Sequence, residues 1–332
     1  MAGNFPKRVI HGGTGKRERE KTRKPLLDFS ASLNPQPPGI SWSFDPASLS
    51  FYPDNDYVEL KEIIAHTFHR DPSEVCVGNG SIELIRVFCS VYLSRGSTFF
   101  AETPTFGEYA LSARLAGAEP VSSVSDATVC FVCNPNNPTG TLHSRLNLLN
   151  GLNDITSPDR MIFADEAFIE LADPAQSLSD VRDDQLFVLR SLTKSFSVPG
   201  IRFGYGFGDP DLIEKIEIAR PPWSVNAYAE AFAREAFRHI PELEASREYI
   251  RKEREWLDRQ IRDLGYSPCP SSVNYILVNC SRNAGPLCRQ LEDCGILVRD
   301  CTSFGLPASI RVAVRTHKEN MALVEALSAC VH

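Results

Sequence analysis

The sequence lacks any long uninterrupted apolar run. With no stretch of about 18 apolar residues, it predicts no membrane-spanning helix. The segment from Met1 to Gly13 also lacks the apolar core of a signal peptide, so we expect a cytoplasmic protein. An excess of positive charge is absent too, because 35 Lys and Arg stand against 42 Asp and Glu, a net charge of −7. This balance argues against general binding to nucleic acids, which requires a basic face.

The ten cysteines lack the pattern of a disulfide scaffold. They are scattered, and most lie in apolar surroundings that are typical of packed free thiols. Cys130 and Cys133 form a Cys-x-x-Cys, but they lie on a strand-like run, where this spacing places them on opposite faces. A zinc site would need a second pair. We therefore expect core thiols, no metal site and a reducing compartment.

The order of apolar segments indicates the fold. Over 332 residues, 42% hydrophobic, the chain can bury a large core. Strand-like and helix-like segments alternate up to about residue 189, which predicts an α/β fold with a mainly parallel sheet and helices on both faces. A long charged helix over 242–264 and further strands then indicate a smaller α+β unit. We expect an N-terminal arm (1–44) that joins the small domain, a large domain (45–222) and a small C-terminal domain (223–332).

One run, Ser191–Gly204, follows a buried strand and centres on Lys194. A lysine at a strand end can be partly desolvated, which lowers its pKa and readies its amine for attack on a carbonyl. Ser191 and Arg202 offer a hydroxyl and a guanidinium fork, which suit a phosphate monoester. Together they suggest a phosphorylated aldehyde, pyridoxal phosphate. A surface lysine in a serine-rich loop is the alternative, and a lone Ser-x-x-Lys would favour it.

Two other strand ends carry polar side chains. Asn137 lies in a turn with two Asn-Pro steps and could donate to an anionic ring oxygen. Asp165 ends an apolar strand and could hold a pyridine nitrogen protonated, although an Asp-Glu pair alone is more often a helix cap or metal ligand. Upstream, Gly80 and Ser81 form a turn that opens a helix. The order Asn137, Asp165, Lys194 is much more specific than any of them alone.

With these motifs the chain resembles the fold-type I pyridoxal-phosphate enzymes of the aspartate aminotransferase superfamily over nearly its whole length. The resemblance implies that Lys194 bonds to the cofactor and moves a proton. It implies that Asp165 pairs with the pyridine nitrogen and that Asn137 touches the phenolic oxygen. The other implied contacts to the cofactor phosphate come from Gly80, Ser81, Ser191 and Arg202, while Phe106 is expected to stack on the ring. Tyr52 is expected to reach the cofactor phosphate that is bound in a neighbouring subunit, which implies a homodimer.

Within that superfamily, the stretches around His11, Asn34, Tyr52, Arg299 and Arg311 look more like L-threonine O-phosphate decarboxylases than histidinol-phosphate aminotransferases. Those decarboxylases make (R)-1-aminopropan-2-ol O-phosphate for cobalamin biosynthesis. A phenylalanine at position 168, where many aminotransferases carry tyrosine, favours them modestly. The implied substrate contacts are Arg311 to the carboxylate, and Arg299, His11, Gly12 and Asn34 to the phosphate. Asn137 is also expected to contact the substrate. Surface salt bridges for the arginines and a solvated loop for His11 are the alternatives.

Two other functions remain open at this point. The chain could transfer an amino group from histidinol phosphate, since the residues do not say which bond at the substrate α-carbon breaks or whether threonine or serine phosphate is preferred. It could also be a non-catalytic, cofactor-binding sensor of the kind fused to DNA-binding domains. Two observations weigh against a sensor: both Lys194 and Asp165 are present, and we see no helix-turn-helix segment before the fold.

Overall fold

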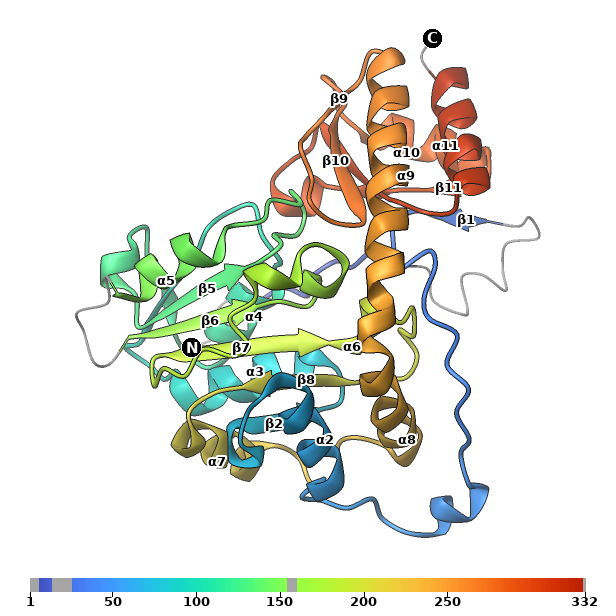
Figure 1. Cartoon of the computed structure of the whole chain (residues 1–332). Helices are drawn as coiled ribbons and strands as arrows, with labels where there is room; N and C mark the ends of the chain where they lie inside the picture. Colours follow the sequence, from blue (N-terminus) through green and yellow to red (C-terminus); the bar gives the residue numbers. More distant parts are fainter. Residues whose placement is uncertain (1–5, 14–25, 154–159, 331–332) are drawn as a thin grey trace.

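The computed structural model describes residues 6–13, 26–153 and 160–330. The larger part of the chain forms one seven-stranded sheet in the order β2-β8-β7-β6-β5-β3-β4 (Figure 1). Its strands are β2 (Val75–Gly78), β3 (Thr98–Ala101), β4 (Glu119–Pro120), β5 (Val129–Cys133), β6 (Met161–Asp165), β7 (Leu186–Ser191) and β8 (Gly204–Phe207). Its helices are α2 (Val58–Phe68), α3 (Ser81–Tyr92), α4 (Glu108–Leu115), α5 (Arg145–Asn153), α6 (Leu192–Ser195), α7 (Pro210–Ala219) and α8 (Ala227–Ala236).

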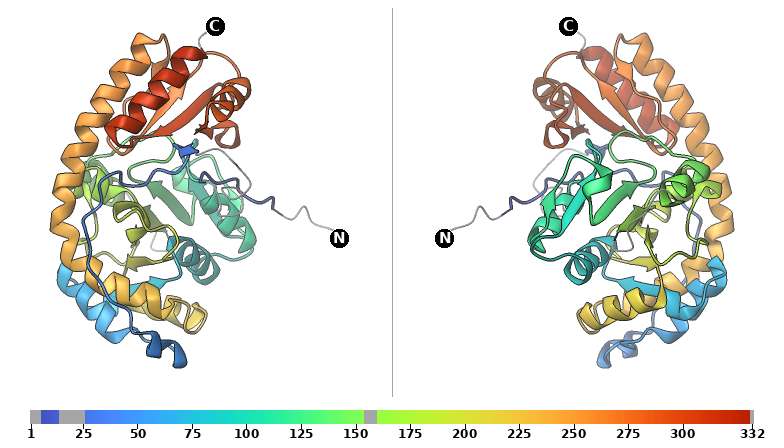
Figure 2. Two further views of the ribbon diagram at one scale, coloured as in Figure 1. Left: turned by 90° about the vertical axis from the view of Figure 1, so that its right-hand side faces the viewer. Right: turned by 90° about the vertical axis from the view of Figure 1, so that its left-hand side faces the viewer.

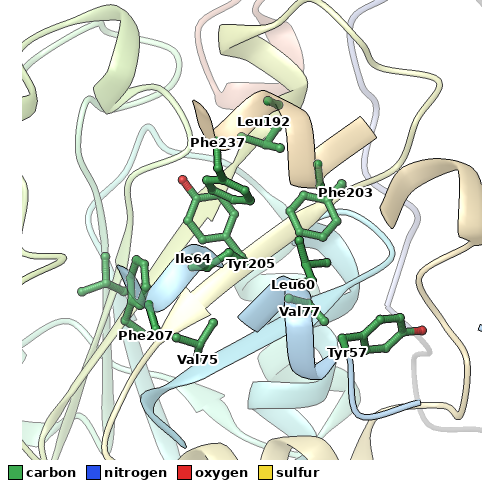
Figure 3. Packing of buried hydrophobic residues seen from close by; sticks show 14 of the residues in the cluster. Tyr57, Leu60, Ile64, Val75, Val77, Leu192, Phe203, Tyr205, Phe207 and Phe237 are labelled. Atoms are coloured by element: carbon green, nitrogen blue, oxygen red, sulfur yellow. The ribbon is translucent and has the colours of Figure 1, made fainter. Parts of the chain in front are cut away.

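The neighbouring strands β4, β3, β5, β6 and β7 pair with one another in parallel, which confirms the mainly parallel sheet. Apolar side chains alternate between two cores along each strand. Val75 and Val77 belong to the core under α2 and α8, whereas Cys76 belongs to the core under α3 and α7. This two-residue period, with helices on both faces, explains why the strands read as continuous apolar runs. Figure 3 shows the first of these cores around Tyr57 and Tyr205.

The strand β8 was not predicted from the sequence, and it is antiparallel to both β2 and β7. Its sequence alternates glycine with aromatic residues, and glycine normally weakens a strand. Here the glycine is required by close packing, because a Cβ on Gly204 would lie 2.3 Å from the backbone nitrogen of Ser81. The missing side chain therefore lets β8 approach the first turn of α3.

The second part of the chain is a smaller α+β unit. Its antiparallel sheet has the order β12-β13-β10-β9. The elements are α9 (Leu243–Asp263), β9 (Ser267–Pro268), β10 (Tyr275–Asn279), α10 (Gly285–Asp293), β11 (Ile296–Leu297), β12 (Arg299–Asp300), β13 (Ser309–Ala313) and α11 (His317–Ala329). The long helix α9 extends from this unit down along the large one, as the orange ribbon in Figure 1 shows.

The described part of the N-terminal arm extends between the small unit and the large one, and it begins at the small unit (Figure 2). There β1 (Leu27–Asp28) pairs in parallel with β11. The predicted arm includes positions 1–5 and 14–25, which lie outside the described residues. The domain boundaries at 44/45 and 222/223 stay predictions.

Two further sequence expectations concern membranes and metals. Within the described ranges, no helix is both long and apolar enough to span a membrane. Nor do those residues contain a group of three or more His, Cys, Asp or Glu side chains suited to a metal ion. Cys130 and Cys133 are free thiols.

Candidate functional site

A cavity of about 340 Å³ opens at the carboxyl ends of the parallel strands, where the two units and the arm meet. Open α/β sheets bind their ligands at this end. The predicted site residues that line the cavity are His11, Gly12, Ser81, Phe106, Asn137, Asp165, Ser191, Lys194, Arg202, Arg299 and Arg311. The structure therefore brings together residues that are up to 300 positions apart in the sequence.

Lys194 lies in the single turn of α6, directly after β7. The hydroxyl of Ser191 caps this turn by accepting a hydrogen bond from the backbone N–H of Thr193 at 3.2 Å. Burial, with the positive charges of Arg311 and Arg202, lowers the pKa of the Lys194 amine to about 8. The amine lies 5.7 Å from the centre of the Phe168 ring. A neutral amine is the nucleophilic form, so this environment prepares Lys194 for attack on an aldehyde.

One corner of the cavity offers donors suited to a phosphate. The helix α3 begins at Ser81, and its first backbone N–H groups carry the positive end of the helix dipole. Gly80 precedes it with a φ of +78°, and a Cβ there would lie 2.2 Å from the guanidinium of Arg202. Only glycine therefore lets Arg202 reach the helix end. With the Ser191 hydroxyl nearby, these residues fit the phosphate of the predicted cofactor.

Asp165, at the end of β6, is 5% exposed and has a hydrogen bond to each carboxylate oxygen. The backbone N–H of Ala167 donates to Oδ1 at 2.9 Å, and the phenol of Tyr109 donates to Oδ2 at 2.7 Å. Burial raises the pKa of Asp165, and the two hydrogen bonds oppose that shift. An ionised carboxylate in this position can hold a proton on a basic ring nitrogen. The sequence prediction missed Tyr109, which lies three residues after Phe106 and one helical turn away.

A buried ion pair supports the same strand ends. Glu166 follows Asp165, and Arg190 precedes Ser191. Arg190 is 2% exposed and donates to Glu166 at 3.1 Å, to Ser177 at 2.9 Å and to Glu170. These bonds link β6 to β7 directly below the cavity.

Two arginines line the opposite wall. Arg299 on β12 and Arg311 on β13 are directly paired across the antiparallel ladder, and they are 7% and 6% exposed. Arg311 donates to the backbone oxygen of Ser30 at 2.9 Å and to Asn137. Its buried Nε has no hydrogen-bond partner among the described residues. Burial lowers the pKa of both guanidinium groups.

Arg299 and the described part of the arm form the mouth of the cavity. The Arg299 guanidinium donates to the backbone oxygen of Ile10 at 2.7 Å and to the hydroxyl of Ser303 at 2.6 Å. His11 contacts Glu108 at 2.8 Å, and Arg86 contacts the other oxygen of Glu108 at 2.7 Å. Ser303 and Glu108 were not predicted as site residues from the sequence.

Two predicted site residues lie elsewhere. Asn34 is 2% exposed and outside the cavity lining. Its amide donates to the backbone oxygen of Ser195 at 2.7 Å and to Ser246 at 3.0 Å, so in this structure it supports the α6 turn rather than facing a substrate. Tyr52 is 78% exposed and stacks on Trp223, with 4.5 Å between ring centres.

Together, the lysine at a strand end, the phosphate corner and the buried aspartate define a site for pyridoxal phosphate on an α/β scaffold. The comparison with protein families agrees. The model of the aminotransferase class I and II family matches residues 40–327, and the chain belongs to this family of pyridoxal-phosphate enzymes.

Individual relatives divide between two activities. A protein of Caldanaerobacter subterraneus, described provisionally as a threonine-phosphate decarboxylase, is 35% identical over 90% of this chain and 88% of its own. A histidinol-phosphate aminotransferase of Symbiobacterium thermophilum is 32% identical over 86% and 84%. Among solved structures, the histidinol-phosphate aminotransferase of Clostridium acetobutylicum is 27% identical with a TM-score of 0.83, covering 92% of this chain and 99% of that one.

Proposed function

We propose that this enzyme decarboxylates L-threonine O-3-phosphate to (R)-1-aminopropan-2-ol O-phosphate, as a step of cobalamin biosynthesis. The observation that carries the proposal is the cross-strand pair of Arg299 and Arg311. Like charges directly opposite each other destabilise a sheet, and burial makes both charges more costly. A substrate that carries two anionic groups a few bonds apart would neutralise both arginines. L-Threonine O-phosphate has this form, with a carboxylate and a phosphate on neighbouring carbons.

The residues then have separate tasks. Arg311, with Asn137, binds the substrate carboxylate, while Arg299 and Ser303 bind the substrate phosphate at the mouth. When bound, pyridoxal phosphate supplies an electron sink for the bond that breaks at the α-carbon. Anchoring both ends of the substrate fixes which bond that is. Lys194 holds a proton at its amine and delivers it to the α-carbon, where it replaces the departing carboxylate.

Amino transfer from histidinol phosphate is the second candidate. It is favoured by the aminotransferase relatives and by the close structural match to the C. acetobutylicum enzyme. Histidinol phosphate has a phosphate but no carboxylate, so it would leave Arg311 without an anionic partner until the amino acceptor binds. The buried, incompletely bonded Arg311 therefore supports the decarboxylase more strongly.

A single assay distinguishes the two reactions. The holoenzyme is supplied with L-threonine O-phosphate and no keto acid, and carbon dioxide and aminopropanol phosphate are quantified. Sustained release of both supports decarboxylation. Turnover that starts only when 2-oxoglutarate is added identifies an aminotransferase and overturns the proposal. Lys194→Ala gives the background rate.

We also propose that the enzyme is a cytoplasmic homodimer in which Tyr52 reaches the cofactor phosphate of the partner subunit. Tyr52 belongs to an exposed apolar patch with Leu49, Phe51 and Trp223, which are 69%, 76% and 46% exposed. Exposed patches of this kind mark contact surfaces. Sedimentation of the holoenzyme should show a dimer. Tyr52→Phe should weaken cofactor binding without dissociating the dimer. A monomer at micromolar concentration would contradict the proposal.

A further inference from the structure

Tyr109 lies behind the cofactor site, and its position is fixed from several sides. The side chain is 1% exposed. Its ring stacks on Phe131 with 5.3 Å between centres and an angle of 7°, and it packs edge-on against Phe106 at 5.5 Å. Because aromatic packing holds the ring in place, the phenol oxygen has little freedom. That oxygen lies 2.7 Å from Oδ2 of Asp165.

We propose that Tyr109 is a positioning residue that holds Asp165 ionised and oriented for the pyridine nitrogen of the cofactor. The inference rests on the assignment of Asp165 to that nitrogen. The Ala167 N–H and the Tyr109 phenol each bind a different carboxylate oxygen, so the plane of the carboxylate is set by two donors on opposite sides. A carboxylate with one hydrogen-bond donor could rotate about its Cβ–Cγ bond. A carboxylate with two donors cannot rotate without losing a hydrogen bond.

The electrostatic surroundings make the hydrogen bond from the Tyr109 phenol important for keeping Asp165 ionised. Burial raises the pKa of Asp165, which favours the neutral acid, and a neutral acid could not stabilise a protonated ring nitrogen. Burial also raises the pKa of Tyr109, so the phenol keeps its proton and remains a donor. Cys133 is the cross-strand neighbour of Asp165, and its thiol has a pKa raised to about 12, so it adds no negative charge.

The remaining titratable groups around the carboxylate come from other elements. Tyr275 on β10 is buried nearby with a raised pKa. Lys194 on α6 and Arg311 on β13 line the same cavity. None of these three is a hydrogen-bond donor to Asp165 in the described structure, whereas Tyr109 is.

The test uses cofactor affinity as well as turnover. Tyr109→Phe removes only the phenol oxygen. We expect it to weaken pyridoxal phosphate binding about tenfold at neutral pH, as expected for one hydrogen bond to a charged group. The loss of affinity as the pH falls should also begin about one pH unit higher, since Asp165 protonates more readily. Tyr57→Phe is the matched control, because Tyr57 is fully buried, lies outside the cavity lining, and has a hydroxyl that donates to and accepts from the backbone of Val225.

A double-mutant cycle separates a positioning role from a structural one. In an Asp165→Asn background, Tyr109→Phe should change cofactor affinity less than twofold, because the charge on which it acts is gone. Equal effects in both backgrounds, or equal effects of Tyr109→Phe and Tyr57→Phe, would overturn the inference. If Asp165→Asn itself binds the cofactor normally, the assignment of Asp165 is wrong instead. Thermal unfolding of each variant shows whether it is folded.

Discussion

The lowered pKa of Lys194 leads to a quantitative prediction about how fast the apoenzyme captures its cofactor. Lowering the pKa of this amine from 10.5, the usual value for a lysine, to about 8 corresponds to about 3 kcal/mol. At pH 7.5 about a quarter of the amine is then neutral, compared with about one part in a thousand for a solvated lysine. Because the neutral amine is the nucleophile, the rate of covalent capture should rise with pH through about 8 and level off above it.

The measurement is a series of rapid-mixing experiments at saturating pyridoxal phosphate between pH 6 and 10. Borohydride stops each reaction and fixes the cofactor to the lysine, and peptide mass spectrometry quantifies the product at Lys194. Lys194→Ala should give no labelled peptide. Arg311→Met should move the midpoint upward, since it removes a neighbouring positive charge. A midpoint near 10.5 in the unmodified enzyme would show that the amine is solvated and would refute the reasoning.

Three further predictions concern single side chains. Phe168→Tyr should lower the pH midpoint of the bound cofactor's absorbance, because a phenol donor would stabilise the charged ring oxygen; an unchanged midpoint would mean that position 168 does not face the ring. Arg299→Ala should lower kcat/KM for phosphorylated substrates by a factor equivalent to about 2–5 kcal/mol, and for unphosphorylated substrates much less. Equal losses for both kinds of substrate would show that Arg299 has a structural role. Arg190→Met should reduce the free energy of unfolding by about 3–5 kcal/mol in denaturant titrations, since it leaves Glu166 buried without its partner; a loss below about 1 kcal/mol would contradict this.

The central parallel strands β5, β6 and β7 could be predicted because they are largely buried on both faces and therefore read as apolar runs. β3 and β5 lie within the alternating strand-like and helix-like segments predicted up to about residue 189. β8 could not be found this way, because the glycine that suits its packing against Ser81 also removes the strand signal. The long helix predicted over 242–264 is α9, Leu243–Asp263, since its charged outer face still leaves a regular apolar stripe.

Lys194, Asp165 and Asn137 could be selected from the sequence because each lies at or just after a strand end within a motif, and the structure places all three at one cavity. Side chains that reach the site from a helix or loop carried no such signal. In the sequence, Tyr109 on α4 does not stand out from other aromatic residues. The structure shows that its phenol donates a hydrogen bond to Asp165. Asn34 shows the converse, because it was assigned by resemblance to substrate binding, yet its amide is bonded to Ser195 and Ser246.

The contacts of the N-terminal arm limit the order in which this protein can fold during its synthesis. Arg311 bonds to the backbone of Ser30, 281 positions earlier, and Arg299 bonds to that of Ile10, 289 positions earlier. Ile10 and Ser30 are therefore synthesised long before the arginines that bind them, and they wait for those partners. At about 5–20 residues per second, that wait lasts roughly 15–60 s. Once β8 has been synthesised, the nascent chain contains every strand of the large sheet, but it cannot enclose a substrate until Arg299 and Arg311 follow.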